Sequence, residues 1–215
     1  MKKSLIAALV LSATILPALQ GCFPIIAAGV TTGVLATVDR RSVGTQTEDE
    51  SIEWKASARV GEKLGDKAHL NFTSYNRKIL MTGEVPSAED KAEAERIVAA
   101  LPNVQYVYNE LAVGPASSFS NRSNDAFITS KVKSRSLDTG KFNPVHVKVV
   151  TEASVVYLMG MLTKPEADAA INVASHTAGV RTVVNLLEII TPAKARELDV
   201  TQSKNNGKPA EVKNP

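Results

Sequence analysis

Two segments of this 215-residue chain repeat each other, and no other feature of the sequence limits the possible folds as strongly. Residues 80–85 read Leu-Met-Thr-Gly-Glu-Val and residues 157–162 read Tyr-Leu-Met-Gly-Met-Leu, so Gly83 and Gly160 align 77 residues apart. Similar motifs continue in the same order on both sides of these glycines. Upstream, Ala56 and Val60 pair with Ile128 and Val132 at a shift of 72. The chain is therefore predicted to contain two copies of one small domain.

The pattern of each copy predicts helix, strand, strand, helix and strand. Apolar residues recurring every four positions indicate the first helix, and alternating residues indicate the strands. A tight turn at Asn76 joins the first two strands, and Ser87 is the expected N-cap of the second helix. In the second copy Thr163 and Glu166 have the spacing of a capping box. In the first copy the elements cover residues 52–64, 69–75, 77–85, 88–101 and 104–113.

This order predicts an α+β fold, with a three-stranded mixed sheet packed on two helices in each domain. Strands joined by a tight turn are antiparallel, whereas strands joined by a helix are parallel. Polar, turn-forming stretches separate the domains from each other and from the chain ends. The predicted boundaries are a signal peptide at 1–21, a lipidated tether at 22–50, domains at 51–113 and 123–191, a linker at 114–122, and a mostly disordered tail at 192–215.

The N-terminus is typical of an exported protein. Lys2 and Lys3 precede an apolar run that ends at Leu19-Gln20-Gly21-Cys22, and Cys22 is the only cysteine in the chain. This ending resembles the lipobox of bacterial lipoproteins, which implies cleavage before Cys22 and acylation of that residue. Acyl chains gain about 0.8 kcal/mol per buried CH₂, so several chains form a lasting anchor. The alternative is an apolar N-terminal helix with Cys22 as a buried apolar residue.

The net charge of the chain and the residue after Cys22 narrow the possible partners and the location of the protein. Once Lys2 and Lys3 are removed with the signal peptide, the formal net charge falls from +3 to +1. A protein with this balance carries no general nucleic-acid footprint, so we expect no nucleic-acid partner. Phe23 follows the cysteine where an aspartate would retain a lipoprotein at the inner membrane, and this predicts transport to the outer membrane.

The two copies, with their Gly-Xaa-Val or Gly-Xaa-Leu strand endings and their Val-Xaa-Xaa-Val-Xaa-Asn last strands, resemble the BON domain of bacterial envelope proteins. Two such domains behind a lipobox resemble the dual-BON outer-membrane lipoproteins of Gram-negative bacteria. The resemblance covers about residues 51–113 and 123–191. It implies a lipid-anchored protein that faces the periplasm, supports outer-membrane integrity and meets division-site or outer-membrane assembly proteins.

No catalytic set of residues stands out, so a non-enzymatic protein without cofactor or metal is expected. The three histidines, His69, His146 and His176, are far apart and share no ligand motif. His69 and His146 hold equivalent repeat positions, which favours a structural role in both copies over a ligand pair. Gly83 and Gly160 are interpreted as strand positions where the backbone bends or packs closely.

The first helix of the second domain carries the candidate binding site. Phe127, Lys131 and Arg135 are spaced to share one stripe, and Lys133 and Leu137 lie further round. An aromatic ring beside cations suits an anionic phospholipid such as phosphatidylglycerol, because the ring enters the headgroup region while the cations meet phosphate. The resemblance implies the same helix, with Phe127 in place of a tryptophan. The first domain is assigned Lys55, Arg59 and Lys63 at the equivalent positions, without an aromatic, so weaker lipid contact is expected there.

Two other interpretations remain. The domains could form a protein–protein interaction module for envelope or outer-membrane assembly proteins, with Phe127 buried between them. A solute-binding enzyme or transport component is the weakest interpretation, since no acid, base or nucleophile can be named.

The lipobox yields the first testable prediction. Cys22→Ser removes the thiol that is acylated, so the product should stay unacylated and mislocalised. Metabolic labelling with a radioactive fatty acid, followed by membrane fractionation, measures both effects. A Cys22→Ser protein that is still labelled and fractionates like the wild type would contradict the assignment of Cys22 as the anchor.

Overall fold

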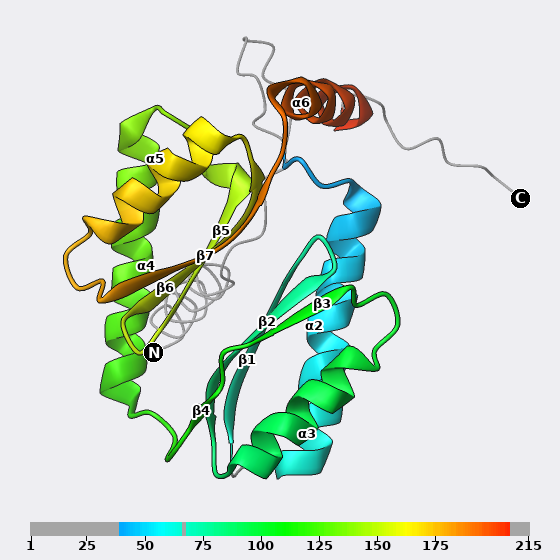
Figure 1. Ribbon diagram of the computed structural model, residues 1–215, viewed down its shortest axis with the longest axis vertical. Helices are drawn as coiled ribbons and strands as arrows, with labels where there is room; N and C mark the ends of the chain where they lie inside the picture. Colours follow the sequence, from blue (N-terminus) through cyan, green and yellow to red (C-terminus); the bar gives the residue numbers. More distant parts are fainter. Residues whose placement is uncertain (1–38, 66–67, 207–215) are drawn as a thin grey trace, which may run out of the picture. The chain divides into compact units, whose positions relative to one another are not determined.

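The computed structural model describes residues 39–65 and 68–206, with side chains described as far as Thr201 (Figure 1). The predicted signal peptide, Cys22 and most of the predicted tether lie outside the described residues. None of the helices within the described ranges is long and apolar enough to cross a bilayer.

The first domain is a mixed sheet with two helices on one face. β1 pairs antiparallel with β2, and β3 and β4 follow each other along the other edge of β2 in parallel orientation. Apolar side chains of both helices and of alternate strand positions form one core, which includes Ile52, Val60, Ile79 and Val98. The elements are α2 (Val43–Leu64), β1 (His69–Tyr75), β2 (Lys78–Val85), α3 (Ala88–Ala99), β3 (Tyr106–Asn109) and β4 (Ala112–Val113).

The second domain has the same strand order and directions. β5 pairs antiparallel with β6, and β6 pairs parallel with β7. The predicted repeat of αββαβ and the α+β class are therefore confirmed. The elements are α4 (Phe119–Thr139), the 3-10 turn η3 (Pro144–His146), β5 (Val147–Glu152), β6 (Val155–Leu162), α5 (Lys164–Ser175), β7 (Thr182–Ile189) and a final helix, α6 (Pro192–Asn206).

A buried aspartate on the first helix of each domain binds the turn of the strand hairpin. Asn76 and Arg77 both have positive φ, and their N–H groups donate to the Asp49 carboxylate at 2.8 and 2.7 Å. In the second domain, Ala153 and Ser154 have the same backbone conformation and donate to Asp125 at 2.9 and 2.8 Å. These bonds fix helix and hairpin together, because the turn offers no backbone acceptors for its N–H groups.

These aspartates correct the register that the sequence indicated for the first helices. Asp49 and Asp125 lie 76 residues apart, as do the N-cap residues Ser42 and Ser118, whereas the sequence comparison used a shift of 72. The error is one helical turn, which leaves the buried face unchanged. In the correct register Phe127 corresponds to Ser51, and Lys131 corresponds to Lys55.

The glycines of the second strand allow a close backbone approach in both domains, as predicted. At Gly83, where φ is 113°, a Cβ atom would lie 1.9 Å from the carbonyl oxygen of His69. At Gly160 a Cβ atom would lie 2.3 Å from the carbonyl oxygen of His146. His69 and His146 therefore hold the same backbone position in the two domains, as their alignment in the sequence indicated.

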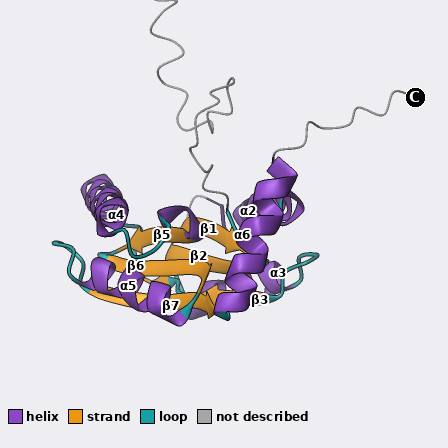
Figure 2. Cartoon of the chain, turned by 90° about the horizontal axis from the view of Figure 1, so that it is seen from above, coloured by secondary structure: helices purple, strands orange, loops and turns teal. Residues whose placement is uncertain are grey.

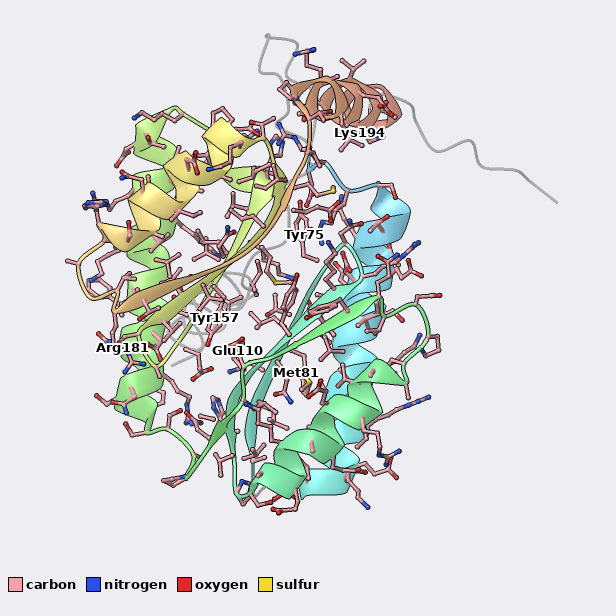
Figure 3. The ribbon with its side chains drawn as sticks, viewed as in Figure 1. Tyr75, Met81, Glu110, Tyr157, Arg181 and Lys194 are labelled. Carbon is pink, nitrogen blue, oxygen red and sulfur yellow. The ribbon has the colours of Figure 1, made fainter. Side chains whose placement is uncertain are left out.

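The faces of the two sheets that carry no helices form a third core, which the sequence analysis did not predict. Figure 1 and Figure 2 show the strands lying between α2 and α3 on one side and α4 and α5 on the other. Tyr75 and Leu80 of the first domain pack with Tyr157, Met159 and Met161 of the second (Figure 3). Burial in this core raises the pKa of Tyr157 to about 12. Both faces of β2 and β6 are thus buried, which explains their nearly continuous apolar sequences.

Two segments predicted to be unstructured are ordered parts of this assembly. α2 begins at Val43, inside the predicted tether, and the tail predicted as mostly disordered forms α6 from Pro192 to Asn206. The side chain of Arg40 connects both of these segments to the second domain. Its guanidinium is 3% exposed and donates to Glu166 at 2.9 and 3.0 Å, to the Met161 carbonyl at 2.8 Å and to Asp199 of α6 at 2.9 Å.

The linker between the domains is also shorter than predicted. α4 begins at Phe119, with Ser118 as its N-cap, so residues 119–122 of the predicted linker belong to the helix. The hydroxyl of Ser118 accepts from the N–H of Asn121 at 3.2 Å and thereby satisfies a free donor of the first turn.

We expect Asp125→Ala to destabilise the chain by about 1–3 kcal/mol, because two turn N–H groups lose their acceptor. Denaturant unfolding followed by circular dichroism measures the change. Asp138→Ala, an exposed position on the same helix, is the matched control and should stay within about 0.5 kcal/mol of the wild type. Equal stabilities of the two variants would contradict the role of Asp125.

The contact of Arg40 with Glu166 predicts a pH dependence at acidic pH. Burial alone would raise the pKa of Glu166, but hydrogen bonds from Arg40 and Thr163 lower it from 4.5 to about 2. A lowered pKa contributes stability that is complete above pH 4.5 and is lost as pH falls towards 2. Unfolding free energies measured across this range should converge for the wild type and Glu166→Gln at the acidic end. A constant difference across the range would contradict this pKa.

Candidate functional site

Large apolar side chains lie exposed along the outer face of α4. Phe119 is 78% exposed, Phe127 62% and Leu137 71%. Phe119 and Leu137 are separated by about 27 Å, since a helix rises 1.5 Å per residue. The exposure of Phe127 contradicts the alternative in which it is buried between the domains. Phe119 was missed by the sequence analysis because it was assigned to the linker.

The helix geometry divides the five predicted lipid-binding residues between two flanks. At 3.6 residues per turn, Phe127 and Leu137 are about 80° apart around the axis, and Lys133 lies on the side of Leu137. Lys131 and Arg135 lie on the other side of Phe127. Between the flanks the exposed surface carries Ser123, Ser130 and Ser134. Phe127, Lys131, Lys133 and Leu137 belong to the outward half of α4, whereas Arg135 lies only about 20° around the axis from the buried Ile128.

Lys131 has two partners within the domain. Its ammonium group donates to the carbonyl oxygen of Ala178, in the loop after α5, and lies 4.7 Å from the centre of the Phe127 ring. A cation–π contact therefore holds the Lys131 ammonium group over the Phe127 ring at the edge of the exposed surface. Lys133 and Arg135 are the more exposed cations of the set.

An apolar groove adjoins the other flank. Its volume is ≈ 320 Å³, and it lies between the end of α4 and η3. Lys133 and Leu137 line it from the helix, and Pro144 and Val145 line it from η3. Val145 is 44% exposed, so the apolar surface of α4 extends beyond the helix at this end.

The first domain presents a different surface. Its α2 carries Lys55 and Arg59 in the positions of Lys131 and Arg135, but Ser51 stands where the second domain has Phe127. Trp54, the only tryptophan of the chain, is 72% exposed one turn away. The sequence analysis did not weigh this residue, because it lies outside the stripe of Lys55, Arg59 and Lys63.

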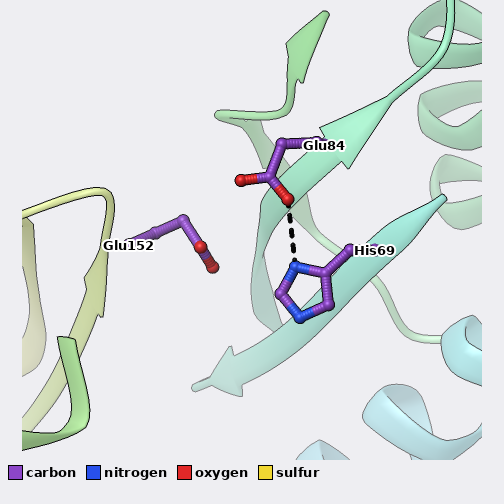
Figure 4. Close-up of side chains that lie close together, drawn as sticks. All are labelled: His69, Glu84 and Glu152. Atoms are coloured by element: carbon purple, nitrogen blue, oxygen red, sulfur yellow. Dashed lines mark hydrogen bonds and ion pairs between the residues drawn. The ribbon is translucent and has the colours of Figure 1, made fainter. Parts of the chain in front are cut away.

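A second cluster joins the two domains (Figure 4). His69 begins β1, Glu84 lies opposite it on β2, and Glu152 ends β5 of the other domain. Their possible ligand atoms all lie within 4.8 Å of one another, and His69 Nδ1 is 3.1 Å from a Glu84 oxygen. The sequence analysis missed this set, because its members come from three strands in two domains and form no motif.

Neighbouring polar groups hold these carboxylates in place. The Asn71 amide donates to Glu152 at 3.0 Å, and the Ser117 N–H of the linker donates to Glu84 at 3.0 Å. Burial, together with the charge of Glu84, raises the pKa of Glu152. In the described part of the chain, neither Glu84 nor Glu152 forms an ion pair with a lysine or arginine.

The profile of the BON domain matches residues 49–115 and 124–191, so the chain belongs to the BON-domain family. The outer membrane lipoprotein DolP of Haemophilus influenzae is 35% identical over 185 residues, which are 85% of this chain and 95% of the relative. The 21 kDa hemolysin of Actinobacillus pleuropneumoniae is 33% identical and covers 71% of this chain and 80% of its own length. Among solved structures, the C-terminal domain of CdsD from Chlamydia trachomatis matches 64% of this chain and 96% of its own, at 13% identity with a TM-score of 0.28, too low to support an argument.

The likeness to DolP extends over nearly the whole of that relative, and it confirms the predicted location at the outer membrane with a lipid anchor. The chain is an outer-membrane lipoprotein with two BON domains. Its relatives are named as a lipoprotein and a hemolysin, and neither name describes an enzyme.

Proposed function

We propose that this lipoprotein binds anionic phospholipid through the outer face of α4 and so supports outer-membrane integrity. The observation that carries the proposal is the row of Phe119, Phe127 and Leu137, exposed along one helix with cations on both flanks. A helix with this arrangement lies in the membrane interface, with its apolar side chains among the acyl chains and its basic residues at the phosphates.

Charge adds to apolar contact on this surface. Each lysine or arginine close to an anionic membrane contributes about 1 kcal/mol. Lys133 borders the apolar row on one flank and Lys131 on the other, so cations meet phosphate groups on both sides when α4 lies parallel to the membrane.

The lipid contact would orient the protein and localise it on the membrane, but it is not needed to attach the protein to the membrane. Acylated Cys22 already keeps the chain at the membrane, whereas α4 fixes which surface of the folded part faces the lipid. Because the contact depends on anionic headgroups, the protein would gather where phosphatidylglycerol-like lipids are enriched. Such placement brings the remaining surfaces towards other proteins of the envelope, including assembly or division-site proteins.

We expect Phe127→Glu to weaken liposome binding at least about tenfold, a loss of about 1.4 kcal/mol, because it removes an inserting ring and adds repulsion from phosphate. The assay uses the mature chain with Cys22→Ser, so that no acyl anchor contributes, and liposomes with or without phosphatidylglycerol. Sedimentation of the liposomes measures the bound fraction. Phe119→Ser and Leu137→Ser should each weaken binding without adding charge.

Ser51→Glu is the matched control, since it places the same charge at the equivalent position of the first domain. It should bind like the unsubstituted chain. Lys133→Glu should lose more binding at low salt than at high salt, because salt screens the charge that it alters. Equal binding by Phe127→Glu and Ser51→Glu, with both folded by circular dichroism, would contradict the proposal.

The single tryptophan tests which domain touches lipid. Trp54 fluorescence should stay unchanged when anionic liposomes are added, because α2 faces away from the bound lipid in this proposal. A chain with Trp54→Phe and Phe127→Trp should show a blue shift instead. A blue shift of Trp54 itself would assign the lipid contact to the first domain.

A further inference from the structure

We propose that His69, Glu84 and Glu152 form a binding site for a divalent transition-metal ion, with Zn²⁺ as the best match, that links the two BON domains. The three side chains offer one imidazole nitrogen and two carboxylates. This mixture of nitrogen and oxygen donors suits zinc, whereas Ca²⁺ and Mg²⁺ prefer oxygen donors alone.

The distances between the donors fit a tetrahedral ion. Ligand atoms at about 2.0 Å from a tetrahedral zinc are separated from each other by about 3.3 Å. His69 Nδ1 and the nearest Glu84 oxygen are 3.1 Å apart, close to that edge. The Glu152 oxygen lies within 4.8 Å of both, so rotation of one flexible side chain completes the set.

The surroundings of the cluster resemble the outer shell of a metal site. Metal-binding carboxylates usually accept a hydrogen bond from a neighbouring group that orients them. Asn71 holds Glu152 in this way, and the Ser117 N–H holds Glu84. Asp125 and Arg122 lie beside His69 and Glu152 in the lining of one cleft, but Asp125 accepts from the β5–β6 turn and Arg122 donates to the Ser117 carbonyl.

The electrostatics of the cluster favour a bound cation. Glu84 and Glu152 approach each other at a partly buried position, where two carboxylates repel and where each loses hydration. A divalent ion would compensate both charges. Solvent reaches the site through two clefts, of ≈ 410 Å³ beside His69 and Glu152 and ≈ 490 Å³ beside Glu84, so an ion has a path to it.

Occupancy would link the two halves of the chain. His69 and Glu84 belong to the first domain and Glu152 to the second, so one ion bridges the domains beside the start of α4. The proposal is independent of lipid binding, because none of its residues lies on the outer face of α4.

Calorimetric titration of the metal-stripped, full-length lipoprotein in detergent with zinc chloride tests the site. We expect one zinc ion per chain and a Kd that rises at least about tenfold in Glu152→Gln and His69→Gln. Loss of a group that only orients a metal ligand already weakens metal binding about tenfold or more, so loss of a ligand should cost at least as much. Magnesium chloride should give no saturable binding. Zinc should also raise the melting temperature of the wild type and not of these variants.

Two control variants separate the site from less specific effects. His176→Gln removes an exposed histidine, and Glu188→Gln removes a carboxylate that pairs with Lys78 across the domains at 2.7 Å. Both should bind zinc like the wild type. The absence of a saturable site, unchanged affinity in Glu152→Gln, or an equal loss in Glu188→Gln would overturn the proposal.

A measurement on the wild type covers the case in which a variant fails to fold. Nitrogen-15 spectra of the histidine side chains should show one ring, that of His69, shifting with one equivalent of zinc. Shifts confined to His146 or His176 would overturn the proposal.

Discussion

The rest of each domain depends on one buried carboxylate that binds the turn of a strand hairpin. The positive φ values of Asn76 and Arg77, and of Ala153 and Ser154, direct two consecutive N–H groups at Asp49 or Asp125. This contact fixes where the first helix crosses the sheet and therefore which of its residues are buried. It also fixes, by exclusion, which residues face solvent. Asp125 thus sets the exposed face of α4 together with the apolar side chains below it.

The two domains share this contact between helix and hairpin but present different surfaces on their first helices. Cations at the positions of Lys131 and Arg135 recur in α2 as Lys55 and Arg59, whereas the exposed Phe127 corresponds to Ser51. In the proposed lipid contact, the inserting aromatic side chain is therefore supplied by the second domain. For the proposed metal site the first domain supplies His69 and Glu84, and the second domain supplies Glu152. The two proposed sites therefore use different elements: the lipid site the outer face of α4, and the metal site the strand ends between the domains.

The core between the helix-free faces of the two sheets holds the two domains together. Tyr75 and Tyr157 pack in a core that neither domain could form alone. Arg40 adds a polar contact that draws the segment before α2 and the final helix onto the second domain. The described part of the chain therefore has ordered structure close to both of its ends.

The sequence by itself determined the five elements that each repeat shares, their order, the capping of α5 at Thr163 and the close approach at Gly83, because each depends on a local pattern or on a glycine that no other residue replaces. It also identified Phe127 as exposed beside cations. It could not determine the register between the first helices, since a slip of one turn keeps the apolar face unchanged. The core between the sheets, the ion pairs of Arg40 and the grouping of His69 with Glu84 and Glu152 depend on residues far apart in the chain. Only the tertiary structure decided these, because the contacts exist only when strands of both domains lie together.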